Sequence, residues 1–94
     1  MELTIFGTQF DLGQIVITHE ARNELPLDEV CLALERHMDG DWGELDSFDQ
    51  EQNDAALING DRLMSRYESQ NGTVFWIITE GDRSVTTVLL PREY

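Results

Sequence analysis

The segment from Asp39 to Asp54 holds the residues best suited to chemistry, because it is dense in carboxylates and contains no Lys or Arg. Its seven acids are Asp39, Asp41, Glu44, Asp46, Asp49, Glu51 and Asp54. Trp42 and Phe48 lie within the same run. A block this acidic either stays solvated as a passive surface or binds something positive, and these two alternatives predict different functions.

A metal site is one possible use of these acids. Asp39-Gly40-Asp41 resembles the start of a calcium-binding loop. Such a loop needs glycine at its sixth position and a bidentate acid at its twelfth, where this chain has Glu44 and Gln50. A looser divalent-cation site between the turn at 40–46 and the following helix stays open, and it would make the chain a metal-dependent enzyme.

The histidines and the cysteine offer little for catalysis. His19, Cys31 and His37 lack the spacing typical of zinc ligands. We expect Cys31 to be a core residue on the apolar stripe of a helix, with no cation nearby to activate its thiol. We expect His37 at the boundary of that stripe. The sequence therefore predicts no catalytic residue, no metal ligand and no cofactor.

A second polar segment runs from Glu80 to Thr87. Arg83 could clamp an anion there, with Glu80 or Asp82 as a base. A turn between two strands needs the same residue types, so we interpret the segment as a turn in which Glu80 pairs with Arg83. Thr86 and Thr87 are expected to point to opposite faces of the following strand.

The acidic run also matches the charge spacing of a nucleic acid. Four of its acids, Asp46, Asp49, Glu51 and Asp54, span eight residues of a predicted helix. At a rise of 1.5 Å per residue this is about one charge per 4 Å, against one phosphate per roughly 3.4 Å of a DNA strand. The arc would suit a basic protein surface such as a nucleic-acid-binding channel. Asp39, Asp41 and Glu44 would extend the contact, and Trp42 would anchor it if exposed.

Composition narrows the class of partner. The chain has 94 residues and a formal net charge of −13, with 19 acids against six Arg and no Lys. Direct binding to nucleic acid or to an anionic membrane is disfavoured, because their negative phosphates and headgroups would repel the negative charge of the chain. The lone Cys31 and the lack of a signal or long apolar segment favour a cytoplasmic protein.

Three helices are expected. The first follows a Thr18 cap and runs to about Leu25, and the second carries an apolar stripe of Leu27, Val30, Cys31, Leu34 and Met38 before Gly40. The third begins at Ser47, which forms a capping box with Gln50, and it closes at Asn59-Gly60. Phe48, Gln52, Ala55 and Ala56 fall in one arc of this helix, which leaves its acids facing water.

The last third of the chain reads as strands at 63–67, 74–79 and 85–90, joined by turns at Asn71-Gly72 and Gly81-Asp82. We predict one α+β domain with two or three helices packed on one face of a C-terminal three-stranded antiparallel meander. Apolar clusters at 3–6 and 10–17 could extend this sheet as N-terminal strands, and their pairing is left open.

Several short motifs carry a resemblance that covers nearly the whole chain. They are Phe10-Asp-Leu-Gly-Gln-Ile-Val, Gly40-Asp-Trp-Gly, Asn53-Asp-Ala-Ala-Leu, Gly60-Asp-Arg-Leu-Met-Ser, Phe75-Trp-Ile-Ile-Thr-Glu, Asp82-Arg-Ser-Val-Thr-Thr and Leu89-Leu-Pro-Arg-Glu-Tyr. The chain resembles a family of short hypothetical proteins common on bacterial plasmids, phages and integrated elements. These are labelled plasmid-related or, loosely, a type I restriction subunit, although no methyltransferase motif is present here. The resemblance implies a mobile-element context and no catalytic residue.

The leading hypothesis is a non-enzymatic acidic interaction protein that inhibits a host DNA-handling or defence complex by mimicking nucleic acid, as antirestriction or anti-CRISPR proteins would. One alternative is a small structural or regulatory protein that homodimerises through its sheet, and another is the metal-dependent enzyme. A third possibility is that the acids only keep the chain soluble. The sequence leaves the partner and the oligomeric state open.

Overall fold

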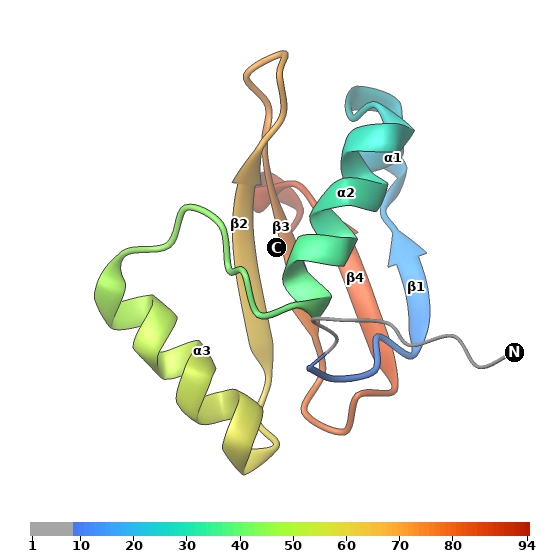
Figure 1. Ribbon diagram of the computed structural model, residues 1–94. Helices are drawn as coiled ribbons and strands as arrows, with labels where there is room; N and C mark the ends of the chain where they lie inside the picture. The colour runs from blue at the N-terminus through green and yellow to red at the C-terminus, as the bar shows by residue number, and fades with distance from the viewer. Residues whose placement is uncertain (1–8) are drawn as a thin grey trace, which may run out of the picture.

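A four-stranded mixed sheet forms the centre of the fold (Figure 1). The structure is a computed structural model and describes residues 9–94. The strands are β1 (Gln14–Ile17), β2 (Leu63–Glu68), β3 (Val74–Thr79) and β4 (Val85–Leu89), in the order β1-β4-β3-β2. The antiparallel meander β2-β3-β4 is confirmed. The apolar cluster at 3–6 lies outside the described residues.

The N-terminal strand β1 joins the sheet, but it makes the sheet mixed, because it pairs parallel to β4. Its ends are fixed by backbone bonds from Gln14 to Ser84 (2.9 Å) and from Thr18 to Val88 (3.0 Å). A parallel pair requires a long crossover, and here the crossover includes three helices and two strands. Local pattern does not reveal a partner that lies so far along the chain.

The two hairpin turns form at the predicted positions, Asn71-Gly72 and Gly81-Asp82. Gly72 has φ of +87°, a left-handed conformation that glycine adopts without the steric cost of a side chain. The turn is closed by bonds between Ser69 and Thr73 (2.9 Å) and from the Gly72 N–H to the Ser69 carbonyl (2.9 Å). In the second turn Arg83 takes up φ of +61°.

The helices α1 (His19–Glu24), α2 (Leu27–Met38) and α3 (Ser47–Asn59) agree with the predicted ranges. The capping box of α3 was predicted wrongly. Asp46 is the cap, and its carboxylate accepts the Asp49 N–H at 2.8 Å, so that Ser47 is already helical. Aspartate and serine are about equally favourable as helix caps. Here Asp46, one position before Ser47, is the residue whose side chain reaches the free Asp49 N–H.

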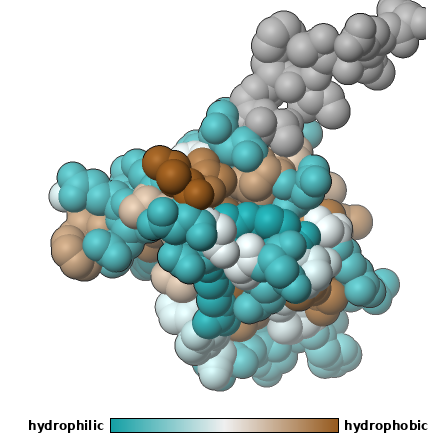
Figure 2. All heavy atoms as spheres, turned by 90° about the horizontal axis from the view of Figure 1, so that it is seen from below, coloured by the Kyte–Doolittle hydropathy of each residue, from teal (hydrophilic) through white to brown (hydrophobic). Residues whose placement is uncertain are grey.

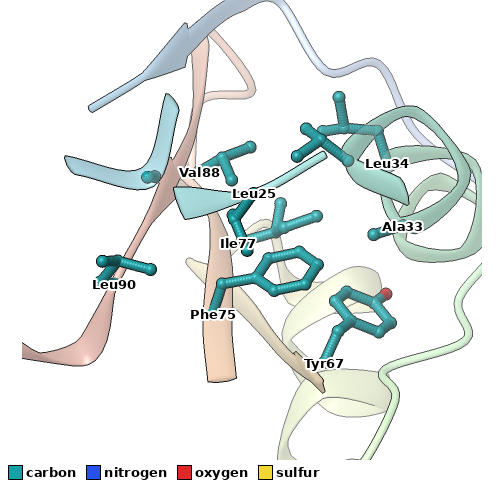
Figure 3. Close-up of a cluster of buried hydrophobic side chains, with 10 residues drawn as sticks. Leu25, Ala33, Leu34, Tyr67, Phe75, Ile77, Val88 and Leu90 are labelled. Carbon is teal, nitrogen blue, oxygen red and sulfur yellow. The ribbon is translucent and has the colours of Figure 1, made fainter. Parts of the chain in front are cut away.

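The main core lies between the sheet and helices α1 and α2. Figure 3 shows Phe75, Ile77 and Val88 projecting from the strands toward Leu25 and the α2 residues Ala33 and Leu34. The buried side of α2 is turned from the predicted stripe toward Val30, Ala33, Leu34 and His37. Leu27 is 65% exposed and Cys31 is exposed, so the prediction that Cys31 belongs to the core is wrong.

Helix α3 lies beside β2, apart from α2 (Figure 1). It packs through a small second cluster that includes Trp42, Ala56 and Leu63. The prediction that Phe48 faces inward is wrong, because Phe48 is 65% exposed while Asn53 is buried. The Asn53 amide donates to the Met64 carbonyl and accepts the Met64 N–H (3.1 Å). An amide that pairs with a strand backbone therefore determines which side of α3 faces the sheet.

Candidate functional site

The acidic run crosses the outer edge of β2 before it enters α3. The Glu44 N–H donates to the Arg66 carbonyl (2.7 Å), and the Arg66 N–H donates to the Trp42 carbonyl (3.2 Å). This pairing contacts the outer edge of β2 at Arg66, and the seven acids are spread over the loop and the helix. Figure 2 views the molecule from below and shows a mostly hydrophilic surface with small apolar groups between.

Two of the seven acids are held by arginines of the same chain. Asp41 accepts two bonds from the Arg36 guanidinium, at 2.7 and 3.3 Å, and this lowers the pKa of the Asp41 carboxyl. Glu44 pairs with Arg66 at 3.0 Å. Both pairs are exposed, so each contributes at most about 1 kcal/mol to stability. Their charges are nevertheless largely neutralised, which weakens their use toward a partner.

Two further acids have structural roles. Asp46 caps α3, and Asp54 accepts a hydrogen bond from the Trp42 indole N–H at 2.9 Å. Trp42 is only 3% exposed, and its ring packs beside those of Phe10 and His37. Trp42 was expected to anchor a partner if exposed. Its burial excludes that role.

The remaining acids, Asp39, Asp49 and Glu51, are exposed and have no arginine partner within residues 9–94. Asp49 and Glu51 are two positions apart and so point about 200° apart around α3. Asp49 lies at a small hollow that Leu45 and Met64 also line. The even row of charges predicted for α3 is thus divided between different sides of the helix.

A buried row of polar side chains lies under the acidic loop, and it includes His37. The Thr86 hydroxyl donates to the Leu12 carbonyl (2.7 Å), so it must accept from Thr79 (2.7 Å). Thr79 then accepts from Nε2 of His37 (2.9 Å), and Nδ1 of His37 is hydrogen-bonded to the Ser65 hydroxyl at 2.5 Å. This order of donors places a proton on Nε2 of His37.

His37 is fully buried, so its predicted place at the boundary of the stripe is wrong. Burial, and secondly the positive charge of Arg83, lower the pKa of the imidazole to about 4. The partners of His37 in this row occupy core-facing positions of the strands: Ser65, Thr79 and Thr86. Polar residues at such positions were the one signal in the sequence that could have indicated the row. The row is buried, and its side chains satisfy one another's hydrogen bonds.

The polar turn at 80–84 is not an anion site. The guanidinium of Arg83 donates to the backbone carbonyls of Asp61 (2.6 Å), Glu80 (3.2 Å) and Ala56 (3.3 Å). Arg83 therefore holds the C-terminal end of α3 against the turn. The carboxylate of Glu80 pairs instead with Arg62 at 3.6 Å, which corrects the predicted Glu80–Arg83 pair.

A hollow of about 330 Å³ opens between α2 and the β2–β3 hairpin. The aromatic rings of Tyr67 and Phe75 contribute to its lining, as do Leu32 and Ala33 of α2. The polar residues that line it are Glu29, Glu35, Arg36, Glu68 and Gln70. Sequence reasoning missed this place, because its acids come from a helix and a hairpin more than 30 positions apart.

Within residues 9–94, no three His, Cys, Asp or Glu side chains come together as a metal site would require. No helix in this range is both long and apolar enough to cross a membrane. Comparisons with protein-family models, with curated proteins and with solved structures found no match to the chain.

Proposed function

We propose that this chain is a non-enzymatic acidic interaction protein that binds a basic protein surface, of the kind that forms the nucleic-acid channel of a DNA-handling or defence complex. The resemblance to plasmid and phage proteins supports a mobile element as its setting. An inhibitor of a host restriction or RNA-guided nuclease fits both the acidity and that setting. The contact needs no reacting group on this chain.

The distribution of ion pairs is the observation that carries the proposal. Four arginines, Arg36, Arg62, Arg66 and Arg92, are paired with carboxylates of the chain itself, and Arg83 is bound to backbone carbonyls. Only Arg22 among the described arginines lacks such a partner. The excess of negative charge therefore stays on the surface, where it can steer a basic partner into contact.

The free acids Asp39, Asp49 and Glu51 are the best candidates for contact within the original run. Asp41 and Glu44 contribute less because arginines already neutralise them. Asp46 and Asp54 would have to give up a helix cap and an indole bond. Exposed Phe48, on the same helix as Glu51, would add apolar area to such a contact.

Capture from a bacterial lysate at low salt, followed by elution with duplex DNA at constant ionic strength, tests this function. A mimic and DNA compete for one channel, so DNA should release the captured protein. Replacing Asp39, Asp49 and Glu51 by Asn, Asn and Gln should weaken capture severalfold. A matched variant that neutralises Asp11, Asp28 and Asp61 should weaken it less. If DNA releases nothing, or if both variants behave alike, the proposed site is contradicted.

Within residues 9–94 the outer edge of β1 has no strand partner, and this favours a second candidate, the structural protein that homodimerises through its sheet. Residues 42–44 bond to the outer edge of β2 at Arg66, whereas no described strand pairs with the outer edge of β1. Ile15 and Val16 on β1 are 46% and 40% exposed. An exposed strand edge with apolar side chains can pair with another strand.

Sedimentation velocity distinguishes this candidate from the first. If the sheet is a dimer interface, the chain should sediment as a dimer, and Val16→Lys should convert it to a monomer. The matched change Leu27→Lys, at an exposed apolar residue of α2, should leave the dimer intact. A chain that is monomeric at all concentrations would exclude the second candidate.

A further inference from the structure

The hollow between α2 and the β2–β3 hairpin combines an apolar wall with an acidic rim. Leu32, Ala33 and Phe75 provide apolar surface, and the hollow holds about 330 Å³. This volume is near the lower end of the range of about 300–1,000 Å³ found for ligand pockets. A single long side chain would fit such a space.

Three carboxylates, Glu29, Glu35 and Glu68, line the hollow. Glu29 also accepts the Gln70 N–H at 2.8 Å, which fixes its position between helix and hairpin. Glu35 and Glu68 are exposed and have no partner within residues 9–94. The two free carboxylates favour a cationic occupant.

Arg36, the one cation of the lining, shows that this environment accepts a guanidinium. Its Cζ lies 4.8 Å from the centroid of the Tyr67 ring, and its Nε is 2.7 Å from Asp41. Because Asp41 offsets the charge of Arg36, the net charge around the hollow stays negative. The Tyr67 hydroxyl donates to the Asp41 carbonyl (2.6 Å) and so holds this wall together.

We propose that this hollow receives one arginine side chain of a protein partner. The methylene stem would cover Leu32 and Ala33, and the guanidinium would bind Glu35 and Glu68. Arginine suits this place better than lysine, because its planar head is weakly hydrated, binds carboxylates in pairs and packs against aromatic rings. Buried arginines are also frequent anchors of protein interfaces.

This assignment rests on the proposed function, since it names the group through which a basic partner is held. It also moves the main anchor away from the acidic run, to acids that lie on α2 and β2. The hollow combines an apolar wall with negative charge. Asp39, Asp49 and Glu51, by contrast, supply charge alone, and they do so on different sides of a loop and a helix.

The test is a titration of the ¹⁵N-labelled chain with Nα-acetyl-arginine methylamide, followed by NMR. Saturable shifts should centre on Leu32, Ala33 and Gln70. The double variant Glu35→Gln/Glu68→Gln should bind the probe about tenfold more weakly, as expected for the loss of charged hydrogen bonds. Leu32→Ser, which shortens the apolar wall at an exposed position, should also weaken binding.

Two controls keep the result specific. The variant Asp11→Asn/Asp61→Asn removes the same charge at exposed positions elsewhere and should bind the probe within about twofold of the original chain. Nα-acetyl-norleucine methylamide, which has an apolar stem and no charge, should not bind. Shifts that spread over all acidic residues, or equal weakening in both double variants, would overturn the proposal.

The lysate capture separates the two levels of inference. Suppose that DNA releases the captured partner, and that the Glu35→Gln/Glu68→Gln variant captures this partner as well as the original chain does. The hollow is then not the anchor of the partner, although the proposed function stands. If the probe binds the hollow while no captured protein is released by DNA, the arginine site stands and the proposed function fails.

Discussion

At the scale of single residues, His37 shows how a polar group is accommodated in a small core. Its two ring nitrogens meet Ser65 and Thr79, which lie 28 and 42 positions away in sequence. The apolar stripe of α2 predicted a boundary residue, because only the strands supply the partners that make burial possible. A buried polar group without such partners would cost about 1–3 kcal/mol.

The buried imidazole makes stability depend on pH. The pKa of His37 is lowered from 6.5 to about 4, so between these values the unfolded chain binds a proton that the folded chain does not. The free energy of unfolding should therefore fall as pH decreases from 6.5 to about 4, by up to roughly 3 kcal/mol, and this contribution should level off below that.

Urea unfolding at pH 7, 5.5 and 4 checks this expectation. His37→Gln keeps a donor and an acceptor but does not titrate, so it should lose the pH dependence that belongs to His37. His19→Gln, at an exposed histidine, is the control and should keep it. Equal pH profiles for the original chain and His37→Gln would contradict the assignment of a neutral buried imidazole.

The Trp42–Asp54 hydrogen bond gives a second prediction at this scale. Asp54→Ala leaves the buried indole N–H without its acceptor and should lower the free energy of unfolding by about 1–3 kcal/mol. Glu51→Ala, three positions earlier on the same helix, should change it by no more than about 0.5 kcal/mol. Denaturation followed by Trp fluorescence measures both. An effect of Glu51→Ala as large as that of Asp54→Ala would argue against this role of Asp54.

At the scale of elements, local signals predicted where helices and turns lie but not how they face. Thr18, Gly60 and Asn71-Gly72 act through their own neighbours, so their caps and turns were predictable. The orientation of α3 was not, since it depends on Asn53 pairing with β2. The parallel pairing of β1 likewise depends on a strand some 70 residues later.

The cap of α3 can be assigned by mutation. Asp46→Ala removes the carboxylate that accepts the Asp49 N–H and should lower the free energy of unfolding by about 1 kcal/mol. Ser47→Ala replaces a residue inside the first turn and should cost less than about 0.5 kcal/mol. Thermal or urea unfolding of the two variants decides between them. A larger loss for Ser47→Ala would restore the capping box predicted from sequence.

At the scale of the whole molecule, the acidic residues serve different purposes. Asp41 and Glu44 pair with arginines, and Asp46 and Asp54 support α3, so fewer of the seven acids are free than their count suggested. The pairings of Glu44 with Arg66 and of Asp54 with Trp42 could not be predicted, because each joins residues that only the tertiary fold brings together. The overall charge of −13 and the α+β class were both readable from the sequence.

The most direct test of the central claim is the affinity of the purified captured partner for this chain, measured across a range of salt concentrations with and without duplex DNA. We expect affinity to fall steeply as salt rises, because the contact is largely electrostatic, and we expect DNA and this chain to exclude each other. An affinity that is insensitive to salt, or a ternary complex that contains partner, DNA and this chain, would contradict a nucleic-acid-mimicking surface.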